Sequence, residues 1–200
     1  MDIESKPLSG RKVKPVAAGS MLSRLLLAVV LLLLSAAARG LDARQTGEYQ
    51  VKAVFLFNVT KFVEWPSEAF ASGTTPFVVG IVGHDPFGEV LPRLAKEQTA
   101  RGRRLEIRHY RAEEDHSACH VLFLSRSVAA QTEKILRRLQ ERPVLTVSDQ
   151  ENFARQGGII EFGLVDDAVR FDINAKMAER AGLKPSSKLL AVARSVVNSS

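Results

Sequence analysis

Cysteine is nearly absent from this sequence of 200 residues, in which Cys119 is the only one. An internal disulfide is therefore excluded, and a folded domain has to be stabilised by packing. We expect the Cys119 thiol to be buried and inert, as free cysteines commonly are. The alternative is a thiol that forms a bridge to a second chain, which would make the protein a homodimer.

Motifs of common catalytic sites are also missing. The sequence contains no G-x-S-x-G, no G-x-x-x-x-G-K-[ST] and no C-x-x-C-H for haem attachment. Its serines lie where helix capping explains them, and Asp149 and Glu151 have no obvious carboxylate partner for acid–base catalysis. We therefore expect a protein that is not an enzyme and that needs no cofactor.

Excess positive charge is concentrated at the N-terminus. The formal net charge is +6, but residues 1–40 contain 6 of the 28 basic residues and 2 of the 22 acidic ones. The rest of the chain therefore has 22 basic and 20 acidic residues, a net charge of +2. Because nucleic-acid binding depends on a strong positive surface, we expect no nucleic-acid partner.

One long apolar run is present, LLLAVVLLLL at residues 25–34. It is shorter than the roughly 20 residues of a membrane-spanning helix, but it matches the hydrophobic region of a signal peptide. Basic residues precede it, and small residues supply an A-x-A-like cleavage site ending at Ala38. We predict that residues 1–40 are a signal peptide removed on export, and that residues 41–200 form a single domain. A translation start at Met21 and a retained signal anchor are the alternatives.

The first part of this domain has the periodicity of an amphipathic helix. The spacing predicts a helix from Glu48 to Trp65, capped by Thr46 and ended by Pro66. We expect its apolar stripe to face the core. The stripe consists of Val51, Val54, Phe55, Val59, Phe62 and Val63.

Strand and helix patterns alternate along the rest of the chain. Strands are predicted at residues 77–82, 104–110, 121–124 and 144–147, and helices at 89–95 and 127–140. Such alternation is typical of an α/β domain with a mostly parallel sheet flanked by helices. Residues 159–164 and 169–173 predict a C-terminal β-hairpin on that sheet, and helices at 174–181 and 186–198 are predicted to close the chain.

Two local patterns are candidate binding sites. The GHDPFG loop at residues 83–88 follows a predicted strand, so His84 and Asp85 are candidate ligand-binding residues, with a tight turn as the alternative. His116, Cys119 and His120 carry metal-ligating atoms within five residues. No second group of ligands lies elsewhere in the sequence, so we expect no metal site.

A series of blocks in a fixed order extends over almost the whole predicted domain. The blocks are Tyr49 with residues 51–53, then 57–58, 63–66, 79–83, 85–88, 119–123, 144–149, 153–154, 157–160, 169–174, 181–183 and 186–190. The amino acids in these blocks and the order of the blocks along the chain resemble the YfiR-like family of exported bacterial proteins.

The resemblance implies a periplasmic, non-enzymatic regulator. Its partner would be the periplasmic sensory part of an inner-membrane diguanylate cyclase, which it would repress, lowering cyclic di-GMP and the output of biofilm and exopolysaccharide. An outer-membrane lipoprotein could relieve the repression. The best-known members carry paired cysteines, so the lone Cys119 departs from the pattern and excludes redox control through an internal bridge. The alternative function is a periplasmic small-ligand sensor coupled to a membrane receptor.

The side of the first helix opposite to the apolar stripe is the predicted partner-binding surface. It contains Asn58, Lys61 and Glu64, with Trp65 at its end. Trp65 is the only tryptophan, and large aromatic residues are common interface anchors. Packing of Trp65 in the core is the alternative.

Overall fold

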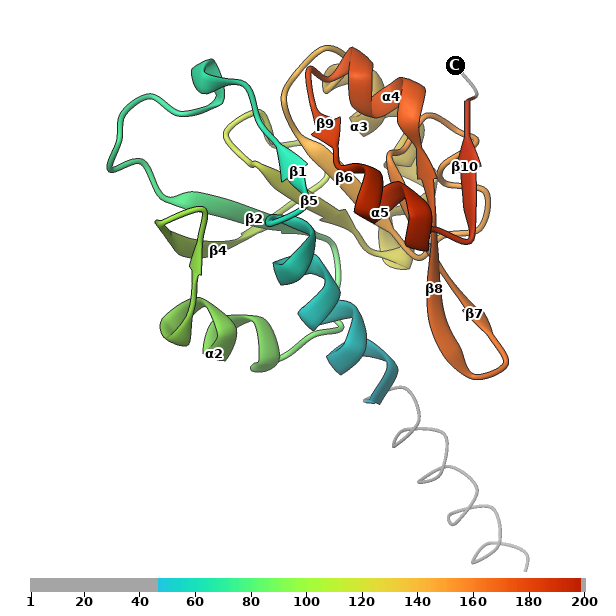
Figure 1. Cartoon of the computed structure of the whole chain (residues 1–200). Coiled ribbons are helices and arrows are strands. Elements are labelled where there is room, and N and C mark those ends of the chain that lie inside the picture. The colour runs from blue at the N-terminus through green and yellow to red at the C-terminus, as the bar shows by residue number, and fades with distance from the viewer. Residues whose placement is uncertain (1–46, 199–200) are drawn as a thin grey trace, which may run out of the picture. The chain divides into compact units, whose positions relative to one another are not determined.

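Uninterrupted apolar runs form the centre of the sheet in the computed structural model, which describes residues 47–198. The strands β2 (Phe77–Val82), β5 (Val121–Leu124) and β6 (Leu145–Ser148) are buried along their whole length. They lie side by side in an eight-stranded sheet of order β10-β8-β7-β6-β5-β2-β4-β3 (Figure 1). All the pairs from β4 (Arg103–Tyr110) to β7 (Ile160–Val165) are parallel. The predicted mostly parallel α/β architecture is confirmed.

Helices cover both faces of this sheet. Alternate residues of β2 belong to different cores, with Phe77, Val79 and Ile81 in one and Val78 and Val82 in the other. The first core is covered by a helix over residues 47–59 and by α2 (Val90–Glu97), α4 (Ala175–Arg180) and α5 (Ser187–Val192). The second is covered by α3 (Thr132–Arg138), which follows the 3₁₀ helix η2 (Arg126–Gln131). No helix within residues 47–198 is long and apolar enough to cross a membrane.

The first helix is shorter than predicted. Helical structure ends at residue 59, where the Thr60 hydroxyl donates a hydrogen bond to the Phe57 carbonyl at 2.7 Å. The chain then enters β1 (Val63–Glu64), which pairs with β9 (Lys184–Pro185). The predicted continuation to Trp65 is wrong, because pairing with a strand about 120 residues later competes with the local preference for helix. Thr46, its predicted cap, lies outside the described residues. A further 3₁₀ turn, η1, spans Ser67–Ala69.

The C-terminal part adds strands to the edge of the sheet. The strands β7 and β8 (Ala168–Asn174) pair antiparallel through a turn in which Asp166 and Asp167 have positive φ. The last predicted helix is wrong in its second half: α5 ends at Val192, and β10 (Ser195–Val197) pairs in parallel with β8. The chain therefore closes with a strand, because two consecutive valines lie beside the open edge of β8. At the opposite edge, the short strand β3 (Thr99–Ala100) pairs with β4.

Gly80 in β2 lies where side chains of neighbouring residues approach the backbone closely. A Cβ atom there would lie 2.6 Å from the Cys119 Sγ and 2.8 Å from the Leu122 Cδ1. We expect Gly80→Ala to lower the free energy of unfolding by about 1–3 kcal/mol through overpacking, measured by urea denaturation. Gly73→Ala is the control, since its Cβ would meet nothing within 4 Å. A loss of stability that is as large in Gly73→Ala as in Gly80→Ala would contradict this explanation.

Candidate functional site

Parallel pairing brings the carboxyl ends of β5 and β6 together. Leu124 and Ser148, the last residues of these strands, are register partners. The next residues along the chain are therefore neighbours at one edge of the sheet. In open α/β sheets this edge is where ligands usually bind.

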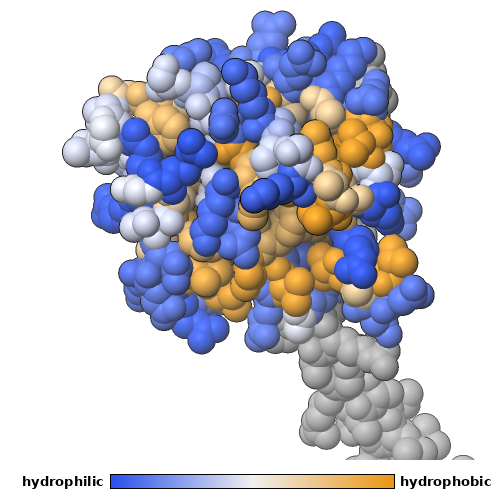
Figure 2. Space-filling model, in the orientation of Figure 1, coloured by the Kyte–Doolittle hydropathy of each residue, from blue (hydrophilic) through white to orange (hydrophobic). Residues whose placement is uncertain are grey.

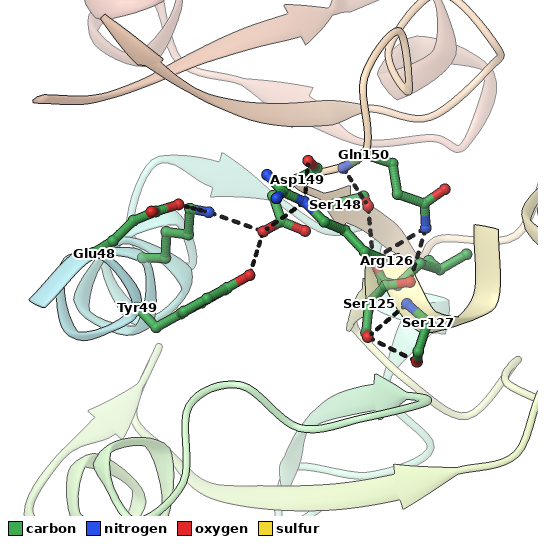
Figure 3. Close-up of polar contacts among 10 residues, drawn as sticks. Glu48, Tyr49, Ser125, Arg126, Ser127, Ser148, Asp149 and Gln150 are labelled. Carbon is green, nitrogen blue, oxygen red and sulfur yellow. Dashed lines mark hydrogen bonds and ion pairs between the residues drawn. The ribbon is translucent and has the colours of Figure 1, made fainter. Parts of the chain in front are cut away.

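Asp149, directly after β6, is the centre of a buried polar cluster (Figure 3). Its Oδ2 accepts hydrogen bonds from the Tyr49 hydroxyl at 2.6 Å and from the Lys52 Nζ at 2.9 Å. The Arg126 Nε donates to the Asp149 backbone carbonyl at 3.1 Å and lies 3.5 Å from Oδ2. Lys52 is only 1% exposed and also forms an ion pair with Glu48, one helical turn earlier.

Hydrogen bonds hold the loops around Asp149 in place. The Ser148 hydroxyl donates to the Leu124 carbonyl at 2.6 Å, and the Gln150 amide Nε2 donates to the Ser125 carbonyl at 2.9 Å. The Ser125 hydroxyl in turn accepts from the Ser127 N–H, capping η2. The predicted capping role of these serines is thus confirmed at Ser125, and it is also confirmed at Ser186 before α5.

The surroundings of the Tyr49 hydroxyl hold it in its protonated form. Burial, and then the hydrogen bond to Asp149, raise the pKa of Tyr49 well above its ordinary value, so its hydroxyl stays a donor. The Asp149 Oδ1 is buried and has no hydrogen-bond partner within residues 47–198. The cluster therefore has one unused acceptor.

This cluster brings together residues that no sequence pattern linked. Lys52 and Asp149 both lie in blocks that carried the family resemblance, but nothing in the sequence joined them, because they are 97 residues apart. One local signal was available. Glu48, Tyr49 and Lys52 lie on the same face of a helix, where polar side chains one turn apart commonly interact.

A second surface lies on the opposite side of the same helix. Val51, Val54 and Phe62 are 53%, 44% and 39% exposed, so the predicted inward orientation of the apolar stripe is wrong for these three residues. The helix instead buries Lys52, Ala53, Leu56 and Phe57. These three residues face outward because a different face of the helix is buried. That face has its own apolar residues at helical spacing and also has Lys52, which pairs with Asp149.

Together with α5, the exposed side of the helix forms an apolar groove of about 290 Å³. We call this surface the helix groove, and it is lined by Phe55, Asn58, Val59, Phe62, Lys188, Leu189 and Val192. Figure 2 shows apolar side chains gathered among polar ones on the face that carries this helix and α5.

The residues predicted to bind a partner have different environments. Asn58 lines the helix groove. Lys61 and Glu64 follow it within six residues along the chain, and both are exposed to solvent. Lys61 lies over the Phe57 ring, 4.6 Å from its centroid. Trp65 is buried, packs edge-on against Phe77 and donates a hydrogen bond to the His120 carbonyl at 3.2 Å. The core-packing interpretation of Trp65 is confirmed, while contact by the other three residues stays a prediction.

The GHDPFG loop is a tight turn. The His84 N–H donates to the Ser127 hydroxyl at 2.9 Å, and the Asp85 Oδ1 accepts from the Phe87 N–H at 2.7 Å. The Asp85 Oδ2 lies 2.8 Å from the His109 Nε2. The turn interpretation is confirmed. Binding of a ligand by these two residues stays a prediction.

A family model described as YfiR/HmsC-like matches residues 49–194. The chain belongs to the YfiR/HmsC-like family. This confirms the resemblance that the sequence blocks indicated, and the match includes Tyr49, Lys52, Arg126 and Asp149.

Among solved structures, a conserved domain protein from Vibrio cholerae O1 biovar El Tor is similar to this YfiR/HmsC-like chain, with a TM-score of 0.52 and 12% identity. The match covers 74% of this chain and 60% of that chain, so this chain spans about three fifths of the other's length. At this identity the similarity concerns the fold alone. None of the curated proteins matches the sequence.

The candidate metal ligands of this YfiR/HmsC-like domain, His116, Cys119 and His120, do not converge on one point, and the two histidines interact with different backbone groups. The His116 Nε2 lies 3.0 Å from the Arg111 carbonyl, whereas the His120 Nδ1 accepts from the Val78 N–H at 3.0 Å. Cys119 is buried, as predicted, and burial raises the pKa of its thiol to about 11. Residues 47–198 contain no group of three or more side chains placed to hold a metal ion.

Removing one member of the buried ion pair should be costly. We expect Lys52→Met to lower the free energy of unfolding by about 3–5 kcal/mol, because the Asp149 carboxylate would remain buried with only the exposed Arg126 as a cationic partner. Chemical denaturation measures the change. Arg137→Gln breaks an exposed pair with Glu133 and should change stability by less than about 0.5 kcal/mol. Equal effects of the two variants would show that the buried pair contributes no more than a surface pair.

The environment of His120 predicts a pH dependence of stability. Burial lowers the pKa of His120, and the neutral ring accepts from Val78 and stacks on Phe70. Below about pH 6.5, His120 binds a proton in the unfolded chain but stays neutral in the folded protein. The contribution of His120 to stability is therefore fully present above that pH and falls as the pH drops toward the folded pKa of His120. We expect unfolding free energies to fall between pH 7 and pH 5, with a smaller slope in His120→Gln. An unchanged slope in that variant, or an equal loss of slope in His84→Gln, would contradict this assignment.

Proposed function

We propose that this protein is exported to the periplasm and that residues 1–40 are removed on export, leaving residues 41–200 as one domain. There it is a non-enzymatic regulator that binds the periplasmic sensory part of an inner-membrane diguanylate cyclase and represses it. Membership of the YfiR/HmsC-like family over residues 49–194 is the observation that carries this proposal. Repression lowers cyclic di-GMP and biofilm output, and an outer-membrane lipoprotein that captures the regulator would relieve it.

The helix groove is our proposed contact surface for the cyclase. Monomeric proteins rarely expose several large apolar residues together without a functional reason, and such surfaces are typical of protein–protein interaction sites. The groove has an apolar floor, with Asn58 and Lys188 among its lining residues. Lys61 and Glu64 extend the surface at the end of the helix, as polar residues surround the apolar centre of many interfaces.

Repression then requires selective binding. The regulator has to bind the inactive conformation of the cyclase more tightly than the active one, because equal affinity for both conformations would not change their populations. The buried ion pair between Lys52 and Asp149 fixes the helix that lines the groove. The groove therefore offers a surface of constant shape, which can distinguish the two conformations of the cyclase.

The test is capture of the cyclase from membranes. The full-length gene is expressed with a C-terminal tag in its own bacterium, and the protein is isolated from solubilised membranes. We expect it to capture a diguanylate cyclase, and we expect a strain lacking the gene to contain more cyclic di-GMP. The mass of the isolated protein tests removal of residues 1–40. No captured cyclase together with unchanged cyclic di-GMP would contradict the proposal.

Variants test the contact surface. We expect Val192→Glu, in the lining of the helix groove, and Lys61→Glu, just after the helix, to weaken capture, the first by about tenfold or more, because a buried unpaired charge is costly at an interface. Val165→Glu is the matched control, since Val165 at the end of β7 is an exposed valine outside the groove, as Val192 is an exposed valine within it. Circular dichroism checks the fold of each variant. Capture that is lost equally in the control, or kept in both Val192→Glu and Lys61→Glu, would place the contact elsewhere.

A further inference from the structure

A polar cleft of about 400 Å³ opens beside Asp149. It lies between the start of the described helix, the loop after β6 and the β7–β8 hairpin, and is distinct from the helix groove. Its volume is in the range of clefts that bind small molecules. The lining includes Lys52, Arg126, Asp149, Glu151 and Leu164.

Most charges in this cleft already have a partner of opposite sign. Lys52 pairs with Glu48 and Asp149, and Arg194 pairs with Asp172 through its Nε at 2.8 Å. A phosphate would meet the carboxylates of Glu48, Asp149 and Glu151, and an amine would meet the cations of Lys52 and Arg126. The cleft therefore favours a ligand that is polar and has no net charge.

Unused hydrogen-bonding groups that a ligand can reach remain at two positions, Arg126 and Glu151. The Asp149 Oδ1 also has no partner within the described residues, but its side chain is only 1% exposed and is closed to a ligand. Within residues 47–198, the hydrogen bond and the ion pair of the Arg126 side chain both use Nε. Its two terminal nitrogens are therefore available as donors, on a side chain that is 65% exposed. Glu151 is exposed and has no ionic partner among the same residues. Figure 3 shows Arg126 beside the Asp149 carboxylate.

Carboxylates beside a guanidinium suit neighbouring hydroxyl groups, because each hydroxyl can donate to one and accept from the other. We propose that this cleft binds a neutral polyhydroxyl ligand, a monosaccharide or disaccharide unit. Glu151 accepts a hydrogen bond from one of its hydroxyls, and Arg126 donates to a neighbouring hydroxyl or to the ring oxygen. Leu164 lines the cleft beside Gly163 and contacts the apolar C–H face of the sugar.

The test is calorimetric titration of the protein, expressed from its full-length gene and purified from the periplasm, with glucose, galactose, mannose, N-acetylglucosamine and cellobiose. Inorganic phosphate, putrescine and glycine are titrated in parallel as an anion, a cation and a zwitterion. Arg126→Gln and Glu151→Gln are the site variants, both at exposed side chains where folding should be kept. Arg155→Gln is the control, because Arg155 is exposed and does not line the cleft.

We expect saturable binding of at least one sugar, weakened about tenfold or more by each site variant and unchanged in the control. The proposal is overturned if no sugar binds, if only phosphate, putrescine or glycine binds, or if both site variants bind the sugar as tightly as the wild type. The result is independent of cyclase capture, since the two experiments use different ligands and different variants.

Discussion

Lys52 and Asp149 are both almost completely buried, and their ion pair offsets much of the cost of burying each charge. One residue comes from the first helix and the other from the end of β6, 97 residues later. Their contact sets the rotation of the helix about its own axis. Once Lys52 faces the sheet, Leu56 and Phe57 face it too, and Val51 and Val54 have to face away.

This rotation gives one helix two chemically different surfaces. Glu48 and Lys52, near its start, line the cleft beside Asp149, and Phe55, Asn58 and Val59, near its end, line the helix groove with α5. The proposed partner and the proposed ligand would therefore contact different ends of the same helix. If binding at one surface altered the position of the helix, the effect on the other would be reciprocal, as for any pair of linked sites.

The parts of the fold that the sequence predicted are those with unambiguous local patterns. FVVGIV and VLFL can only be buried strands in a chain of this composition, and their alternation with helical segments implies parallel pairing. The errors lie where two patterns compete. The first helix has two stripes of apolar spacing, and periodicity alone cannot say which one is buried. Residues 195–197 fit a helix by spacing, but a free strand edge of β8 recruits them into the sheet.

The sequence by itself determined the class of fold, the burial of its central strands, the tight turn at residues 83–88 and the family of the chain, because each depends on residues that are close in the sequence or on their order along it. Only the tertiary structure decided which side of the first helix is exposed and which charged residues meet at Asp149. Those features depend on contacts between residues about 100 positions apart, and the energy of a buried charge is decided by its partner, which no local pattern reveals.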